Sequence, residues 1–115
     1  MSCWIGSSRG DRFVVPASAY AEVLVGPFKA SPGAPDIVDA LLGRLGADIA
    51  SADAEIARRA AQLRARHGSL RLPDALVIGT ADQLEADLLL TTDAGWPTAR
   101  ALGVACRIDR VRRPD

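Results

Sequence analysis

Three acidic residues occupy positions that a simple helix-surface pattern does not explain. Glu22 lies among apolar neighbours in SAYAEVL, Asp74 lies in the first turn of the otherwise apolar LPDAL, and Asp93 follows the apolar run LLLTT. Three carboxylates that converge on one edge of an α/β sheet could bind Mg²⁺, which takes hard oxygen ligands and keeps several waters. Such an ion can activate water and stabilise the charge that develops on a phosphodiester. Together the three acids suggest a divalent-metal site.

Each acid also has a simpler explanation when it is taken alone. Glu22 could face solvent, as most glutamates do. Asp74 could be a helix N-terminal acid favoured by the helix dipole. Asp93 could initiate a turn. The metal-site hypothesis therefore depends on whether the fold brings the three residues to one place.

Apolar periodicity predicts the elements that would position these acids. The run RFVV ends at Pro16, which suits the first turn of a helix whose stripe is Tyr20, Val23, Leu24 and Phe28. Further helices are predicted over 36–45, from a cap at Ser51 or Asp53 to His67, over 72–84 and over 97–102, with strands at 47–50, 88–92 and 104–108.

The order of these elements predicts the fold class. Strands alternate with helices, and the run at 88–92 is apolar throughout, as in a parallel strand that is buried on both faces. We therefore expect a three-layer α/β fold with a mainly parallel sheet, formed by one domain over residues 1–115. Sites in such sheets form at the carboxyl ends of the strands, where Asp93 is placed by sequence position.

Composition excludes several classes of protein. Hydrophobic residues make up 49% of the 115, so the chain is not intrinsically disordered. No apolar stretch approaches the roughly 18 residues of a membrane span, and no signal-peptide pattern opens the chain, so we expect a soluble cytoplasmic protein. The two cysteines, Cys3 and Cys106, make neither a disulfide framework nor a zinc site.

Charge alone does not indicate a nucleic-acid partner. Fourteen basic and fourteen acidic residues cancel, although arginines cluster in two places. One cluster is Arg107, Arg110, Arg112 and Arg113, and the other is Arg58, Arg59, Arg64, Arg66 and Arg71. Arginine forks match phosphate geometry, but a solvated helix face explains the second cluster equally simply.

Other catalytic classes lack their motifs. His67 is the only histidine, and no Gly-x-Ser-x-Gly elbow is present to form a serine hydrolase triad. The sequence has neither a Walker A loop nor a dinucleotide-binding fingerprint, so no nucleotide cofactor is indicated. Trp96 could stack on an RNA base, although a packing role at the strand end is the simpler interpretation.

Three segments resemble VapC-type PIN domains. The segment VVPASAYAEVL (residues 14–24) resembles the second strand and the following helix of that family, whose conserved Glu corresponds to Glu22. The segment LRLPDALVIGTA (residues 70–81) looks like the helix-opening motif with its metal-binding Asp, here Asp74. The segment LLTTD (residues 89–93) looks like the strand-end motif that supplies Asp93, with Thr92 or Thr91 as its hydroxyl neighbour. The similarity runs from about residue 10 to residue 108.

The resemblance implies a specific function. VapC-type PIN domains are endoribonucleases in which carboxylates hold one or two Mg²⁺ or Mn²⁺ ions that activate water against an RNA phosphodiester. They are usually the toxin of a toxin–antitoxin pair, are restrained by a VapB-type antitoxin and are commonly homodimeric. For this chain the resemblance implies that Glu22, Asp74 and Asp93 are the metal ligands and catalytic residues, and that Thr92 supports them.

The sequence departs from the family at its start. PIN domains open with an apolar strand that ends in an Asp and is followed by a helix, and no such segment precedes Phe13. We therefore expect a domain that lacks its first, central strand and one metal ligand, with unpaired backbone groups on the neighbouring strands. Dimerisation or strand exchange could hide that open edge.

Two explanations of this departure remain open. Either the start codon is assigned too late, which the intact remaining motifs favour, or the gene is truncated. A truncated product could be a catalytically inactive fragment that binds the antitoxin without cleaving RNA.

Overall fold

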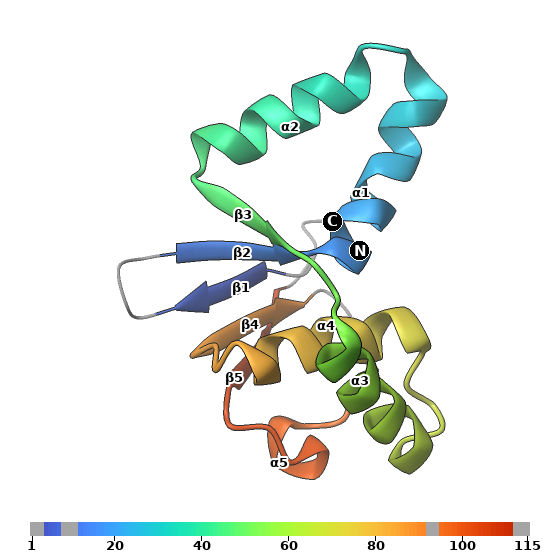
Figure 1. Ribbon diagram of the computed structural model, residues 1–115, viewed down its shortest axis with the longest axis vertical. Coiled ribbons are helices and arrows are strands. Elements are labelled where there is room, and N and C mark those ends of the chain that lie inside the picture. The colour runs from blue at the N-terminus through green and yellow to red at the C-terminus, as the bar shows by residue number, and fades with distance from the viewer. Residues whose placement is uncertain (1–3, 8–11, 92–94, 112–115) are drawn as a thin grey trace.

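The computed structural model describes residues 4–7, 12–91 and 95–111, which form one five-stranded sheet with helices packed around it (Figure 1). The strand order is β3-β2-β1-β4-β5. The strands are β1 (Trp4–Ser7), β2 (Arg12–Pro16), β3 (Ala47–Ala50), β4 (Leu88–Thr91) and β5 (Arg107–Arg110). The helices are α1 (Ala17–Ala30), α2 (Ala34–Arg44), α3 (Ala54–Arg66), α4 (Leu72–Gln83) and α5 (Ala99–Leu102). The predicted α/β class, with parallel strands that alternate with helices, is confirmed.

Strand direction separates β1 from the other four strands. β2 pairs with β3 in parallel and β4 pairs with β5 in parallel, whereas β1 runs antiparallel to both of its neighbours, β2 and β4. Only four residues separate β1 from β2, and a parallel connection needs a dozen or more. The short connection therefore dictates the antiparallel direction.

A strand occupies the centre of the sheet, so the expected unpaired backbone groups on the neighbouring strands do not occur there. β1 occupies the position between β2 and β4, with Ile5 opposite Val14 on one side and opposite Leu89 on the other. Periodicity did not indicate a strand in so short a segment that contains Gly6. Because β1 is reversed, its last residue, Ser7, lies opposite Arg12, the first residue of β2. β1 therefore pairs the backbone groups of its neighbours, but it ends at the edge of the sheet where they begin.

The last strand starts three residues later than predicted. Gly103 adopts a left-handed φ of 69° after α5, and the Arg107 N–H then donates to Asp87 O at 3.0 Å to align β5 with β4. The preceding Val104 and Cys106 are buried in the core and are not part of the strand. Their apolar character is typical of a strand, although they pack from a bend.

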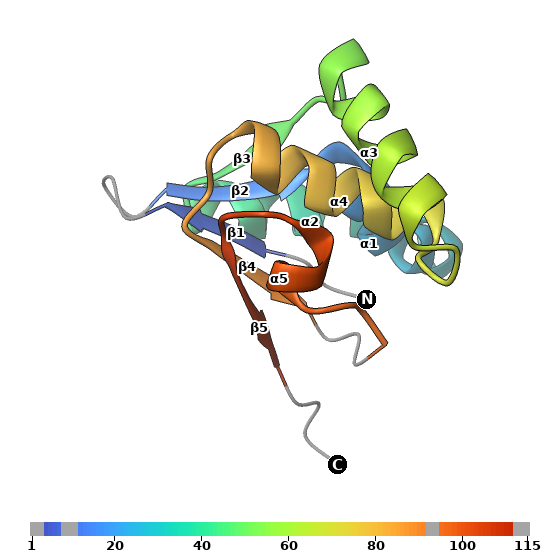
Figure 2. The same ribbon diagram turned by 90° about the horizontal axis from the view of Figure 1, so that it is seen from below.

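The core lies where α4 meets the sheet. α4 packs against β2 and β4 and is covered by α3, and Figures 1 and 2 show both helices on the same face of the sheet. Ala75, Ile78 and Ala81 of α4, together with Leu63 of α3 and Leu89 of β4, are fully buried. In the described part of the chain, no helix is long and apolar enough to cross a membrane.

Candidate active site at the carboxyl edge of the sheet

The candidate site lies where β2 and β4 end. These two strands run in the same direction, so their carboxyl ends, Pro16 and Thr91, lie at one edge of the sheet. α1 begins directly after Pro16, and Figure 1 shows α4 beginning on the same side of the molecule. α1 also packs against α4. The edge therefore brings together the start of two helices and the end of two strands.

Glu22 lies on the second turn of α1 and is half-buried. Ser18 lies four residues earlier, so both side chains are on the same face of α1. The Ser18 hydroxyl oxygen is buried and has no hydrogen-bond partner in the part of the chain that the structure describes. Because burial of an unpaired hydroxyl costs free energy, Ser18 stands out as a polar group at this edge.

Asp74 is the third residue of α4 and is only 2% exposed. It follows Leu72 and Pro73, and proline suits this turn because its missing N–H would have no intrahelical partner. The helix dipole favours a carboxylate in the first turn, but that effect does not require burial. Burial of a carboxylate is costly unless it is compensated. A favourable interaction with the helix dipole therefore does not explain why Asp74 is buried.

Asp93 and Thr92 lie outside the described residues. The structure does describe the residues on either side of them. Thr91, the last residue of β4, is fully buried, and its carbonyl accepts the Val111 N–H at 2.8 Å. On the other side, the Arg110 guanidinium donates to Trp96 O at 2.8 Å. Arg110, the last residue of β5, and Val111 after it are therefore bonded to the chain on either side of the segment that carries Asp93.

Comparison with protein families decides what kind of domain this is. The model of the PIN domain matches residues 4–102, which is most of the chain. The chain belongs to the PIN-domain family. Proteins with this domain are typically metal-dependent nucleases. The family resemblance that the three motifs indicated is confirmed.

A comparison with solved structures agrees with this assignment. A chain described as "Toxin-antitoxin complex from Klebsiella pneumoniae" is similar at a TM-score of 0.60 and 27% sequence identity. The similarity covers 73% of this PIN domain chain and 68% of that chain. The comparison with curated proteins gave no match.

The donor set of this PIN domain suits a hard cation, although the described residues do not complete a site. Among residues 4–7, 12–91 and 95–111 there is no group of three His, Cys, Asp or Glu side chains that could hold a metal ion. Glu22 and Asp74 supply carboxylate oxygens, and the buried, unpartnered hydroxyl of Ser18 is a further oxygen donor. Oxygen donors are the ligands that Mg²⁺ and Mn²⁺ accept.

Sequence reasoning did not select Ser18. The signal that could have found it is its spacing, since a residue four positions before Glu22 lies on the same face of a helix. A serine near a helix start is most often a helix-capping residue. In the structure Pro16 is the N-cap and makes no side-chain capping bond, so Ser18 lies inside the helix.

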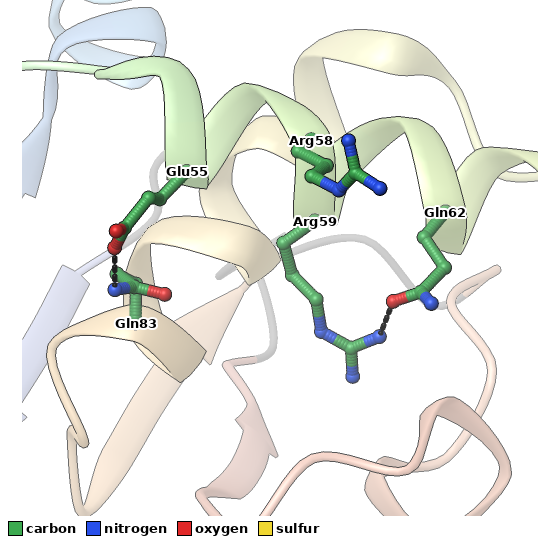
Figure 3. A pocket seen from close by; sticks show the side chains of 5 residues that line it. All are labelled: Glu55, Arg58, Arg59, Gln62 and Gln83. Carbon is green, nitrogen blue, oxygen red and sulfur yellow. Dashed lines mark hydrogen bonds between the residues drawn. The ribbon is translucent and has the colours of Figure 1, made fainter.

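Two of the arginines of α3, Arg58 and Arg59, line a pocket between α3 and α4. Figure 3 shows a pocket of about 440 Å³ lined by Glu55, Arg58, Arg59, Gln62 and Gln83. Arg59 bonds Gln62 within the pocket and forms an ion pair with Asp82 at 2.8 Å, while Glu55 accepts from the Gln83 amide. The two acids balance the two arginines, and only Arg58 points away without such a bond. This pocket is a polar contact between α3 and α4.

Proposed function

We propose that this PIN domain is a Mg²⁺- or Mn²⁺-dependent endoribonuclease and the toxin component of a toxin–antitoxin pair. The observation that supports it most directly is the burial of Asp74, which is 2% exposed at the edge of the sheet where sites form. A buried carboxylate is best compensated by a cation or by donors directed at it. The family and the motif around Asp74 support a divalent metal as that cation.

Three carboxylates would hold the metal. Asp74 and Glu22 are contributed by α4 and α1, which pack together, and Asp93 is contributed by the segment after β4. When bound, the ion supplies activation of water and stabilisation of charge on the phosphodiester. Asp74 is buried in the first turn of α4, so it would help to fix the position of the ion. Thr92 would support the carboxylates as a hydroxyl neighbour.

The partner proposal has a separate basis. The Klebsiella neighbour is a toxin–antitoxin complex, and its chain aligns with this one over 73% of the residues. We therefore include a VapB-type antitoxin as the protein partner and RNA as the substrate. We also treat residues 1–115 as one domain.

Cleavage of RNA in the presence of Mg²⁺ or Mn²⁺, with and without EDTA, tests the nuclease. We expect cleavage that EDTA abolishes and that Asp74→Asn lowers by at least about a hundredfold, because the amide loses the charge that holds the ion. Circular dichroism and the melting temperature establish that the variant is folded.

Asp36→Asn is a matched control for that variant. Asp36 is also the third residue of a helix and also follows a proline, but it is exposed on α2. We expect its cleavage rate to stay within about twofold of wild type, since a solvated acid of this kind affects only the helix dipole. Cleavage that survives Asp74→Asn, or that falls equally in both variants, would show that the carboxylate assignment is wrong.

One observation favours a second function, which is antitoxin binding without cleavage. The carboxyl end of β1 lies away from the site edge, and β1 itself contains no acid, so this strand supplies no further carboxylate. Binding of the antitoxin measured by calorimetry, alongside the RNA assay, separates the two functions. Tight binding by a folded chain that does not cleave RNA supports the second function, and metal-dependent cleavage excludes it.

A further inference from the structure

Positive charge is concentrated around the turn that joins α3 to α4. Residues 56–73 contain five of the fourteen basic residues of the chain and none of its fourteen acidic residues, although the net charge of the whole chain is zero. Arg58 and Arg59 lie nearer the start of α3 and line the pocket there. The other three are exposed and lie close to the turn, namely Arg64, Arg66 and Arg71. We call these three residues the basic turn.

The backbone of the turn is held by the fold. Leu70 is buried in the core, and its N–H donates to His67 O at 2.9 Å. The Arg64 guanidinium donates to Gly68 O at 3.0 Å and carries several other N–H donors. Within the described part of the chain, the guanidinium groups of Arg66 and Arg71 form no ion pair or hydrogen bond. The basic turn therefore presents its charges to solvent from a fixed backbone.

The basic turn borders the candidate active site. Arg71 is the N-cap of α4, three residues before Asp74, so roughly 4.5 Å along the helix axis separates the two residues. Arg71 is exposed, whereas Asp74 is buried. Figures 1 and 2 show the α3–α4 turn on the side of the molecule where α1 begins after β2. The arginines thus lie beside the edge where the proposed metal ligands gather.

Helix stability does not explain the charge of Arg71. The helix dipole favours a cation in the last turn, where Arg66 ends α3, but disfavours one at the start of a helix, where Arg71 lies. Serine, threonine, asparagine or aspartate at this position would accept from first-turn N–H groups, and Arg71 makes no such capping bond. An arginine here therefore costs stability, which indicates a role in binding.

We infer that the basic turn binds the phosphate backbone of an RNA strand beside the phosphodiester that is cleaved. Guanidinium groups match phosphate oxygens in a bidentate geometry, and such contacts position a strand without reading its sequence. This inference rests on the proposed ribonuclease function, because the site carboxylates and the arginines would then act on neighbouring phosphates. The carboxylates repel a polyanion, and the nearby arginines offset that repulsion.

Fluorescence anisotropy of a labelled single-stranded RNA of mixed sequence tests the contact with the full chain. The titrations are made in EDTA, in which the proposed metal-dependent enzyme does not cleave, and over a series of KCl concentrations. We expect Arg66→Gln and Arg71→Ser each to weaken binding by about threefold or more at low salt. Each should also reduce the slope of log affinity against log salt by about 0.7, because one phosphate contact is lost.

Arg44→Gln is the matched control for Arg66→Gln. Both arginines are exposed and are the last residue of a helix, but α2 leads into the start of β3. Because β3 is parallel to β2, its start lies at the edge of the sheet opposite the site. RNA affinity should therefore stay within about 1.5-fold of wild type, with an unchanged salt slope. Equal losses in the two variants would show that only net charge matters and would overturn the inference.

Arg71→Ser should change stability and RNA binding in opposite directions. The N-cap backbone is extended, with ψ at 150°, as a capping serine requires. We therefore expect the melting temperature to rise by about 4 °C while RNA affinity falls. A higher melting temperature together with unchanged RNA affinity would contradict the inference, because the arginine would then serve neither the helix nor the strand.

Competition identifies the occupant of the basic turn. An acidic protein segment is the alternative, and polyglutamate is its probe. RNA that is displaced by polyglutamate at an equal or lower concentration of charge would rule out RNA as the preferred occupant, as would a wild type that binds no RNA. Binding through the basic turn without cleavage in Mg²⁺ would refute the nuclease and leave this inference standing. Cleavage with a KM that Arg66→Gln and Arg71→Ser leave unchanged would refute this inference alone.

Discussion

Burial separates residues that look equivalent in the sequence. Asp36 and Asp74 both follow a proline at a helix start, but Asp36 is exposed and Asp74 is 2% exposed. The difference arises because α4 lies under α3 and against β2 and β4, whereas α2 packs mainly against α1 and β3. The Asp74 carboxylate therefore needs a compensating partner within the protein. The Asp36 carboxylate can obtain that compensation from water.

Burial also distinguishes the ion pair of Arg59 from that of Arg107. Arg59 pairs with Asp82 where both side chains are less than a third exposed, and it also bonds Gln62. We predict that Arg59→Ala lowers the free energy of unfolding by about 2 kcal/mol, because it leaves a part-buried carboxylate without its cation. Urea denaturation measures the change.

Arg107→Ala is the matched control for Arg59→Ala. Arg107 pairs with Asp109 at 2.7 Å, but its side chain is mostly exposed, and such pairs contribute roughly 0–1 kcal/mol. A loss for Arg107→Ala as large as that for Arg59→Ala would contradict the assignment of Arg59 as a tie between α3 and α4.

At the scale of elements, connection length and close helix contact decide the arrangement. The four residues between β1 and β2 force a hairpin, so the central strand runs against the other four. α3 and α4 approach closely at Gly79, where an added Cβ would lie 3.2 Å from Ile56 O and 3.4 Å from Ala60 N. Both of these atoms belong to the backbone, which moves less easily than a side chain.

We predict that Gly79→Ala destabilises the protein by about 1 kcal/mol, although alanine is intrinsically the better helix former by about that amount. The cost arises because α3 must move away from α4. Gly43→Ala in α2 is the control, since nothing lies within 4 Å of its added Cβ, and it should stabilise by up to about 1 kcal/mol. A lower melting temperature for Gly79→Ala together with a higher one for Gly43→Ala would confirm the close contact. A higher melting temperature for both variants would contradict it.

At the scale of the whole molecule, the chain has a well-buried part and a poorly buried part. α3, α4, β2 and β4 contribute most of the buried hydrophobic core. α1 and α2 form an arm that Figure 1 shows standing above β3, the edge strand. Large apolar side chains such as Phe28, Ile37 and Leu41 are exposed on this arm. The well-buried part is therefore expected to contribute most of the free energy of unfolding.

We predict that Leu63→Ala, in the core, costs about 3 kcal/mol, while Leu41→Ala, on the arm, costs less than about 0.5 kcal/mol. Leu63 is fully buried and Leu41 is 53% exposed, so only the first variant leaves a cavity. Urea denaturation measures both. A large cost for Leu41→Ala would show that the arm contributes to the monomer core.

The sequence by itself determined the family and the α/β class, and it predicts three site acids. The motifs around Glu22, Asp74 and Asp93 are local. Hydrophobic periodicity and turn residues also indicate structure over only a few positions. The sequence also indicated most of the helices within a few residues, since caps and prolines mark their ends.

Tertiary structure alone decided three further points. It placed β1 in the centre of the sheet and reversed it, because strand pairing depends on distant neighbours and on connection length. It buried Asp74 and left Asp36 exposed, because burial depends on what packs over a helix and not on the residues beside the acid. It also left Val25 and Phe28 of α1 exposed, because an apolar stripe reads the same in sequence whether or not the chain covers it.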